Sequence, residues 1–194
     1  ISLCILGCVN FGKLENIDAL DRLTRLMVRF LDNLIEEQKY PMDATEWPTK
    51  GYRFLGIGIS DFAHFLAKNE ATLGSQKART LTHQWAERFQ YGLITASVDL
   101  AAERGACEYF ERTKYSDGIL PIDSYKKDVD DLVKRKLSYD WTTLRNDIKE
   151  HGLRHSTLSA QMPSESSSVV SNATNGVEPP RDFLSIKKSK KGTL

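Results

Sequence analysis

The sequence lacks the features that usually assign a chain to a membrane, to the extracellular space or to nucleic acid. Its 194 residues include only three cysteines and carry a formal net charge of +1. It has no long apolar run, and its first residues do not resemble a signal peptide. We therefore expect no membrane helix, no strongly basic nucleic-acid surface and no secreted disulfide scaffold. An odd, small number of cysteines favours a reducing compartment, for which the cytoplasm is the default.

The size of the chain predicts a single domain. At 194 residues and 40% hydrophobic content it can bury one sizeable core. The first residue is Ile1 rather than an initiator methionine, and an apolar run follows at once. We therefore expect further polypeptide upstream of this segment.

Strand-like and helix-like patterns alternate along the chain. Apolar runs bounded by turn residues predict strands, and apolar residues at helical spacing behind a capping residue predict helices. The expected strands are Ser2 to Val9, buried on both faces, Tyr52 to Ile59, Ser156 to Gln161 and a strand-like run from Phe183 to Ile186. The expected helices are Asn16 to about Gln38, Ser60 or Asp61 to about Lys68, Ser75 to Arg104, and Trp141 to His151 capped by Asp140, with a loop from Pro41 to Pro48. The alternation predicts an α/β architecture with parallel strands.

One turn has the chemistry of an anion cradle. The apolar run before Met162 stops at Pro163 and opens into Ser164-Glu165-Ser166-Ser167. If a helix begins there, its unpaired backbone N–H groups and the positive end of its dipole bind phosphate without arginine or lysine. A serine-rich turn is also typical of a helix cap or a solvated loop, and the pattern alone leaves these alternatives open.

The cysteines and histidines give a weaker signal. Cys4 and Cys8 share one face of the first predicted strand, but about 13 Å separates residues four apart in a strand, too far for a disulfide. An inert buried thiol is the simplest interpretation of each. Cys107 has no cysteine or histidine at metal spacing, and Gly152 interrupts the helical pair of His151 and His155. We therefore predict no metal site.

The glycines of the second strand do not form a dinucleotide-binding loop. Gly56 and Gly58 have the spacing of its first two glycines, but Asp61 stands where the third is required. Gly56 and Gly58 instead predict a close approach of neighbouring backbone.

Four segments together resemble the large catalytic chain of aerobic (class I) ribonucleoside-diphosphate reductases. They are Met162 to Ser168, Asn172 to Arg181, Asp117-Gly118-Ile119-Leu120-Pro121-Ile122-Asp123 and Leu55-Gly56-Ile57-Gly58-Ile59. The resemblance runs from Ile1 to Leu194. It implies an α/β fold, roughly the second half of that family's ten-stranded α/β barrel, in a fragment of one barrel domain truncated at both ends.

The resemblance also implies roles for single residues. Cys4-Ile5-Leu6, followed by Asn10 and Gly12, is similar to the family segment that holds one of two redox-active cysteines supplying electrons to the substrate. Its partner cysteine would lie upstream, as would the loop bearing the radical cysteine. Cys8 departs from the family pattern and is interpreted as structural. The substrate diphosphate would be bound by Pro163, Ser164, Glu165, Ser166 and Ser167, with Glu165 capping the helix through its side chain.

The partners implied are those of the family. They are a ribonucleoside diphosphate, the remainder of the large chain, a small subunit that generates a radical at a metal site, and thioredoxin or glutaredoxin as reductant. No cofactor is expected in this segment itself. Two alternatives remain open: a fragment of a cobalamin-dependent ribonucleotide reductase, and a noncatalytic remnant that only assembles with a partner chain.

Overall fold

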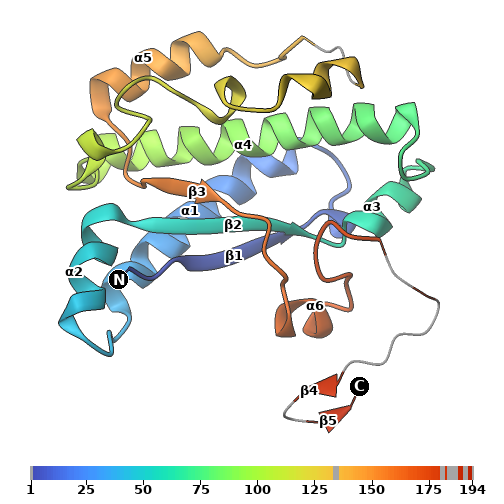
Figure 1. Cartoon of the computed structure of the whole chain (residues 1–194), viewed down its shortest axis with the longest axis horizontal. Helices are drawn as coiled ribbons and strands as arrows, with labels where there is room; N and C mark the ends of the chain where they lie inside the picture. The colour runs from blue at the N-terminus through green and yellow to red at the C-terminus, as the bar shows by residue number, and fades with distance from the viewer. Residues whose placement is uncertain (1, 133–135, 180–181, 183–187, 190–191, 194) are drawn as a thin grey trace.

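Three parallel strands and the helices that connect them form the centre of the molecule in a computed structural model (Figure 1). The structure describes residues 2–132, 136–179, 182, 188–189 and 192–193. The strands are β1 (Ile5–Asn10), β2 (Phe54–Ser60), β3 (Thr157–Ser159), β4 (Lys188–Ser189) and β5 (Gly192–Thr193). The α-helices are α1 (Ala19–Glu37), α2 (Asp43–Tyr52), α3 (Phe62–Lys68), α4 (Gln76–Arg104), α5 (Trp141–His151) and α6 (Ser166–Val170). Short 3-10 helices are η1 (Phe11–Lys13), η2 (Phe110–Arg112), η3 (Pro121–Asp123) and η4 (Lys127–Asp131).

The order of the strands places the long helices on one face of the sheet. The order is β1-β2-β3, with β1 parallel to β2 and β2 parallel to β3. Two successive connections between parallel strands lead from β1 to β2 and from β2 to β3, in the same direction across the sheet. When both connections are right-handed, as is usual, their helices lie on the same face of the sheet. The predicted α/β architecture with parallel strands is therefore confirmed for this part of the chain.

Helices α1 and α4 pack side by side and run in the same direction. Arg88 of α4 pairs with Asp21 near the start of α1, whereas Glu103 near the end of α4 pairs with Arg29 further along α1. Exposed pairs of this kind add little stability, but their order fixes the relative direction of the helices. A Cβ atom on Gly92 would lie 2.7 Å from Oγ1 of buried Thr24. Glycine at this position therefore lets the two helices approach closely.

The opposite face of the sheet is not covered by α1. A Cβ on Gly7 of β1 would lie 3.1 Å from Leu31 and 3.2 Å from Met27, so Gly7 faces α1. Side chains alternate along a strand, and Leu6 therefore points to the other face, where it is 54% exposed. The prediction of a first strand buried on both faces is wrong for this reason.

Two of the predicted helix caps, Ser75 and Asp140, are confirmed, and the prediction of a loop between two prolines is wrong. Ser75 accepts a hydrogen bond from the N–H of Ala78, and Asp140 accepts from Thr142 and Thr143, which confirms both predicted helix starts. The loop predicted from Pro41 to Pro48 is wrong, because α2 spans most of it. Pro48 lies inside α2, where Thr45 and Thr49 donate their hydroxyls to backbone carbonyls of the helix.

The third strand is shorter than predicted, and part of the C-terminal prediction cannot be compared. Only Thr157–Ser159 pairs with β2, rather than the whole of residues 156–161. The run predicted from Phe183 to Ile186 lies outside the described residues. Among the helices of the described residues, none is both long and apolar enough to cross a lipid bilayer.

Candidate functional site

The uncovered face of the sheet carries the Cys4 thiol. A Cβ on Gly56 of β2 would lie 3.0 Å from the sulfur of Cys4 and 3.2 Å from Cβ of Ala160. Any larger residue at position 56 would therefore fill the space beside the thiol. The thiol and the segment that leads into residues 163–167 thus meet over the same glycine.

Cys4 is a free, exposed thiol. Partial burial raises the pKa of Cys4, so the structure holds it as a thiol rather than as an activated thiolate. Cys8 and Cys107 are also free, and burial raises the pKa of Cys107 to about 11. Of the three, Cys4 is exposed, whereas Cys8 is half-buried and Cys107 is buried, and thiol exchange requires such exposure.

Residues 163–167 follow the C-terminal end of β3 and lead into α6. Glu165 occupies the N-cap position with φ 47° and ψ −117°, a backbone conformation that non-glycine residues rarely adopt. Contrary to prediction, the Glu165 side chain makes no capping hydrogen bond. The helix start was predicted correctly, but another residue shapes its turn.

That residue is Asn175, whose side chain and backbone hold the turn together. Its Oδ1 accepts the N–H of Glu165 at 2.6 Å and the hydroxyl of Ser168 at 3.2 Å, and its carbonyl accepts the N–H of Ser164 at 2.8 Å. The N–H of Ser167 donates to the carbonyl of Ser164 at 3.0 Å. Three N–H groups of the predicted cradle, those of Ser164, Glu165 and Ser167, thus have partners within the chain.

Asp61, at the end of β2, anchors the segment that carries Asn175. Its N–H donates to the carbonyl of Thr174 at 3.0 Å, and its Oδ1 accepts the N–H of Thr174 at 3.1 Å. Its Oδ2 lies 2.9 Å from Nδ1 of His64. A Cβ on Gly12 would lie 2.0 Å from that same oxygen, so only glycine fits there. Asp61 was predicted as a possible helix cap, but its side chain makes no capping bond and ties the loop to the sheet instead.

The segments at the C-terminal ends of the strands also contain buried polar atoms that lack hydrogen-bond partners. Within the described residues these include Nδ2 of Asn10, Oγ of Ser164 and Oγ1 of Thr174. Such atoms are uncommon in folded proteins and call for a specific explanation. At the end of a parallel sheet, where ligands commonly bind, they fit a site that receives a polar ligand.

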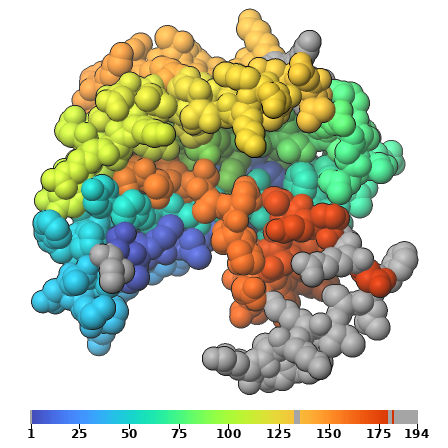
Figure 2. All heavy atoms as spheres, in the orientation of Figure 1, coloured from blue at the N-terminus to red at the C-terminus, as the bar shows by residue number. Residues whose placement is uncertain are grey.

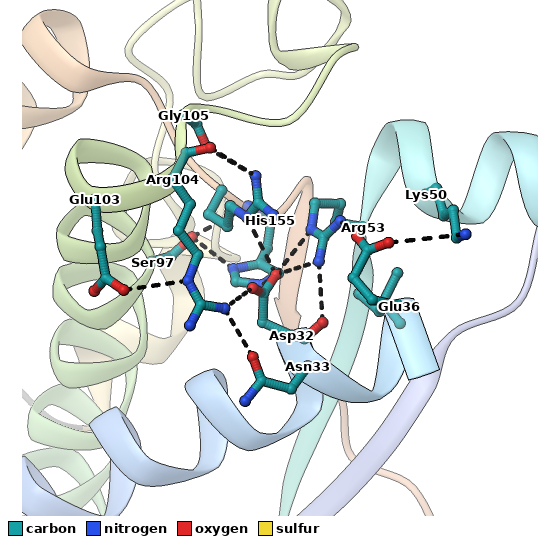
Figure 3. Close-up of polar contacts among 12 residues, drawn as sticks. Asp32, Asn33, Glu36, Lys50, Arg53, Ser97, Glu103, Arg104, Gly105 and His155 are labelled. Carbon is teal, nitrogen blue, oxygen red and sulfur yellow. Dashed lines mark hydrogen bonds and ion pairs between the residues drawn. The ribbon is translucent and has the colours of Figure 1, made fainter. Parts of the chain in front are cut away.

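A second polar cluster lies at the opposite ends of the strands, around buried Asp32 (Figure 3). Its Oδ1 lies 2.8 Å from Nε of Arg53, 3.0 Å from Nε2 of His155 and 3.2 Å from Nε of Arg154, and its Oδ2 lies 2.9 Å from Nη1 of Arg104. Burial alone would raise the pKa of Asp32. The hydrogen bond from His155 and the charges of Arg53 and Arg154 outweigh burial and hold that pKa below its ordinary value.

This cluster has the character of a structural tie rather than a site. Arg53 precedes β2 and His155 precedes β3, so the Asp32 carboxylate fastens both strand starts to α1. Sequence reasoning missed it because the partners stand 21, 72, 122 and 123 positions from Asp32. No local pattern relates residues so far apart. Within the described residues, no group of three or more His, Cys, Asp or Glu side chains is placed to hold a metal.

Comparisons with known proteins show the family of the chain. The family model described as ribonucleotide reductase, barrel domain, matches residues 1–194. The ribonucleoside-diphosphate reductase subunit alpha of Haemophilus influenzae is 54% identical over 194 residues, which is 100% of this chain and 26% of that protein. Subunit alpha of reductase 1 of Escherichia coli K12 is 53% identical over 160 residues, covering 82% of this chain and 21% of that protein. The subunit alpha of Enterobacteria phage T4 is 47% identical over 197 residues, or 100% of this chain and 26% of that protein. The chain thus spans about a quarter of the length of these curated relatives.

Proposed function

This chain belongs to the ribonucleotide reductase barrel-domain family, and from that membership we propose that it acts as part of a class I ribonucleoside-diphosphate reductase catalytic subunit. The reaction would convert ribonucleoside diphosphates to 2′-deoxyribonucleoside diphosphates. The remainder of the large chain would complete the ten-stranded barrel of which residues 1–194 form roughly the second half. The relatives' names, which all specify a subunit alpha, favour this reading over the cobalamin-dependent alternative.

One observation carries the proposal. The sulfur of Cys4 and the Cβ of Ala160, three residues before Pro163, both lie against Gly56 on the uncovered sheet face. A redox thiol and a phosphate-binding turn must serve the same small substrate, and this arrangement keeps them on one face. The buried, unpartnered Ser164 hydroxyl lies within the turn itself.

Cys4 would act as one half of a dithiol. As the ribose 2′-hydroxyl leaves as water and carbon 2′ gains a hydrogen, two thiols give up two hydrogens and join as a disulfide. Cys4 supplies one sulfur, and a cysteine elsewhere in the large chain supplies the other. Thioredoxin or glutaredoxin would then reduce the disulfide by thiol exchange.

Residues 163–167 would bind the substrate diphosphate through backbone N–H groups and serine hydroxyls. The N–H groups of Ser164, Glu165 and Ser167 already donate within the chain, so among the described residues 164–167 the N–H of Ser166 is the one left to donate to a phosphate, and Asn175 holds the turn that presents it. The radical that starts the reaction would come from a small subunit with its own metal site. No cofactor is assigned to residues 1–194.

The test of this proposal is a Cys4→Ser change in the full large chain, assayed with small subunit and reductant. We expect sustained turnover to be abolished, because serine cannot form the disulfide. Substrate affinity should stay within about a factor of three, because exchanging thiol for hydroxyl removes little binding free energy. Cys8→Ser is the matched control, since Cys8 lies in β1, four residues after Cys4, and it should keep steady-state turnover. A wild-type steady-state rate in Cys4→Ser would make Cys4 an inert thiol.

A further inference from the structure

A groove of about 630 Å³ lies between α4 and the segment that follows residue 120. One wall is formed by α4 residues, among them Ala78, Ala86 and Gln90, and the other by residues from Pro121 to Leu132 together with Leu137 and Trp141. In Figure 2 the yellow residues of this second wall lie across the green residues of α4. The volume is within the range of small-molecule sites, and the lining is mostly apolar.

Three residues that line this groove each have a side-chain atom that is buried without a hydrogen-bond partner in the described part of the chain. These atoms are Nε2 of His83, Oε2 of Glu87 and Nε2 of Gln90. Residues at positions i, i+4 and i+7 share one side of a helix, so α4 presents all three to the same groove. An apolar groove with a few convergent polar groups is the usual form of a ligand site.

Glu87 gives the groove its charge preference. The residue is 6% exposed, and its Oε1 accepts the N–H groups of Ser138 at 2.7 Å and Tyr139 at 3.2 Å and the indole N–H of Trp141 at 3.1 Å. Three donors on one oxygen match an ionised carboxylate, which only accepts hydrogen bonds. The second oxygen remains for a donor from outside the chain. Burying that oxygen beside apolar carbon is costly unless a donor reaches it.

The other charged groups of the lining leave this preference intact. Arg79 also lines the groove, but it stands eight residues before Glu87, about 12 Å along the helix. Asp130, on the facing wall, accepts the hydroxyl of Tyr125 and adds negative charge. The groove therefore favours a cation near Glu87.

We propose that this groove binds a small apolar cation, a flat aromatic body carrying an amidinium or ammonium group that donates to Oε2 of Glu87. The body fills the space between Ala86 and the facing wall, and Gln90 and His83 supply further polar contacts at its edge. This site is separate from Cys4 and residues 163–167. It does not depend on the proposed reductase function.

The test uses benzamidine and its uncharged near-isostere benzamide as probes on the full polypeptide that contains this chain. Binding is followed by calorimetry and by the NMR signal of the Trp141 indole N–H, which donates to Glu87. We expect benzamidine to bind at millimolar concentration or better and to shift that signal, and benzamide to bind at least about tenfold more weakly.

Glu87→Gln is the informative variant, because the amide keeps an oxygen for the three N–H donors and loses the charged oxygen. It should weaken benzamidine at least about tenfold and leave benzamide unchanged. Asp130→Asn removes a carboxylate from the exposed rim and should change benzamidine affinity by less than about twofold.

Ala86→Leu, at an exposed helix position within the groove, should block both probes. This variant tests the site even if Glu87→Gln does not fold. Equal benzamidine affinity in wild type and Ala86→Leu, or no shift of the Trp141 signal in wild type, would overturn the proposal.

Discussion

His155 is held neutral inside the protein by its surroundings. It is fully buried, and burial together with the charges of Arg53 and Arg154 lowers its pKa, although the Asp32 carboxylate opposes this. Because a carboxylate only accepts hydrogen bonds, the Nε2 of His155 carries the proton that is donated to Asp32, 3.0 Å away. Its Nδ1 then accepts from the Ser97 hydroxyl at 2.9 Å. Every polar atom of the imidazole ring thus has a partner in the neutral form.

This arrangement predicts that the free energy of unfolding falls as pH decreases from about 7 to about 5. The unfolded chain binds a proton at His155 near its ordinary pKa of about 6.5, whereas the folded chain resists that proton. Stability from this group is therefore complete above that pKa and decreases below it, by up to about 1.4 kcal/mol for each pH unit. His155→Gln, measured by urea unfolding at each pH, should show a smaller decrease.

His151→Gln serves as the control for that measurement, because His151 is an exposed histidine only four residues away. Its unfolding profile should follow that of the wild type. An identical pH profile in wild type and His155→Gln would mean that His155 does not titrate differently on unfolding.

At single positions, a local motif drew attention to residues 163–167 and the family resemblance to Cys4, and the roles of both stay predictions. Neither signal pointed to Asp32, Arg53 or His155. An aspartate within an amphipathic helix is usually solvated, and only the folding of distant segments against it makes it a buried hub. Asn175 belongs to the segment from Asn172 to Arg181 that carries the resemblance, but its structural role was not predicted, because that role depends on a turn ten residues earlier.

Among the elements, those with sequence-local start and stop signals were predicted best. Helices α4 and α5 begin behind caps at Ser75 and Asp140 and end before glycines. Helix α2 was missed because proline inside a helix removes a hydrogen bond and normally ends it. In the folded chain, Thr45 and Thr49 donate their hydroxyls to backbone carbonyls, and Trp47 and Tyr52 pack against Tyr109. Neither kind of contact can be recognised from a local sequence pattern.

Two substitutions at Ser166, the first residue of α6, test whether the diphosphate is bound by backbone N–H groups or by the serine hydroxyl. If backbone N–H groups bind the diphosphate, Ser166→Ala should weaken binding by only about 1 kcal/mol, the contribution of one hydroxyl bond. Ser166→Pro should weaken it much more. Proline at the first helical residue is tolerated by the helix, but it deletes an N–H and restricts Glu165, whose φ of 47° is incompatible with a following proline.

Calorimetry with a ribonucleoside diphosphate and the full large chain measures both changes, and circular dichroism checks the fold. A larger loss in Ser166→Ala than in Ser166→Pro would identify the hydroxyl as the contact. Binding unchanged in both folded variants would place the diphosphate elsewhere.

Asn175 offers an independent test of how the same turn is positioned. Asn175→Ala removes the acceptor of the Glu165 N–H, a bond worth about 1 kcal/mol, whereas the Ser168 hydroxyl keeps the Glu165 carbonyl, 2.7 Å away, as its acceptor. We expect the KM for the diphosphate to rise several-fold with a smaller change in kcat. Hydrogen exchange at the Glu165 amide should accelerate, a readout that does not depend on activity.

Ser171→Ala is the control, because its hydroxyl donates to Ser167 and Ser168 carbonyls at the far end of α6. It should alter neither KM nor exchange at Glu165. Unchanged Glu165 exchange in Asn175→Ala would show that the turn keeps its shape without this side chain.

Taken as a whole, the molecule has one covered and one open sheet face. Two crossovers of the same hand place α1 and α4 on one side, and the small or exposed residues Cys4, Leu6, Gly56 and Gly58 occupy the other. The α/β class followed from the alternation of patterns. The ten-stranded barrel implied by the family resemblance stays a prediction, because the described residues form one three-stranded and one two-stranded sheet.

The three cysteines of residues 1–194 lead to a prediction about this segment expressed alone. Reduction of a ribonucleotide by the proposed route needs a pair of thiols and a separate radical-bearing thiol. Of the three cysteines here, Cys4 is assigned to the pair, and Cys107 is buried with a raised pKa. Cys8, in β1, is four residues from Cys4, and four residues of extended chain span about 13 Å, which is beyond disulfide reach. The isolated segment should therefore form no deoxynucleotide from a ribonucleoside diphosphate, even with a small subunit and dithiothreitol.

The full large chain under the same conditions is the positive control, with product measured by chromatography. Product from residues 1–194 alone would mean that Cys8 or Cys107 carries the radical, and the assignment of that role to another part of the large chain would be wrong.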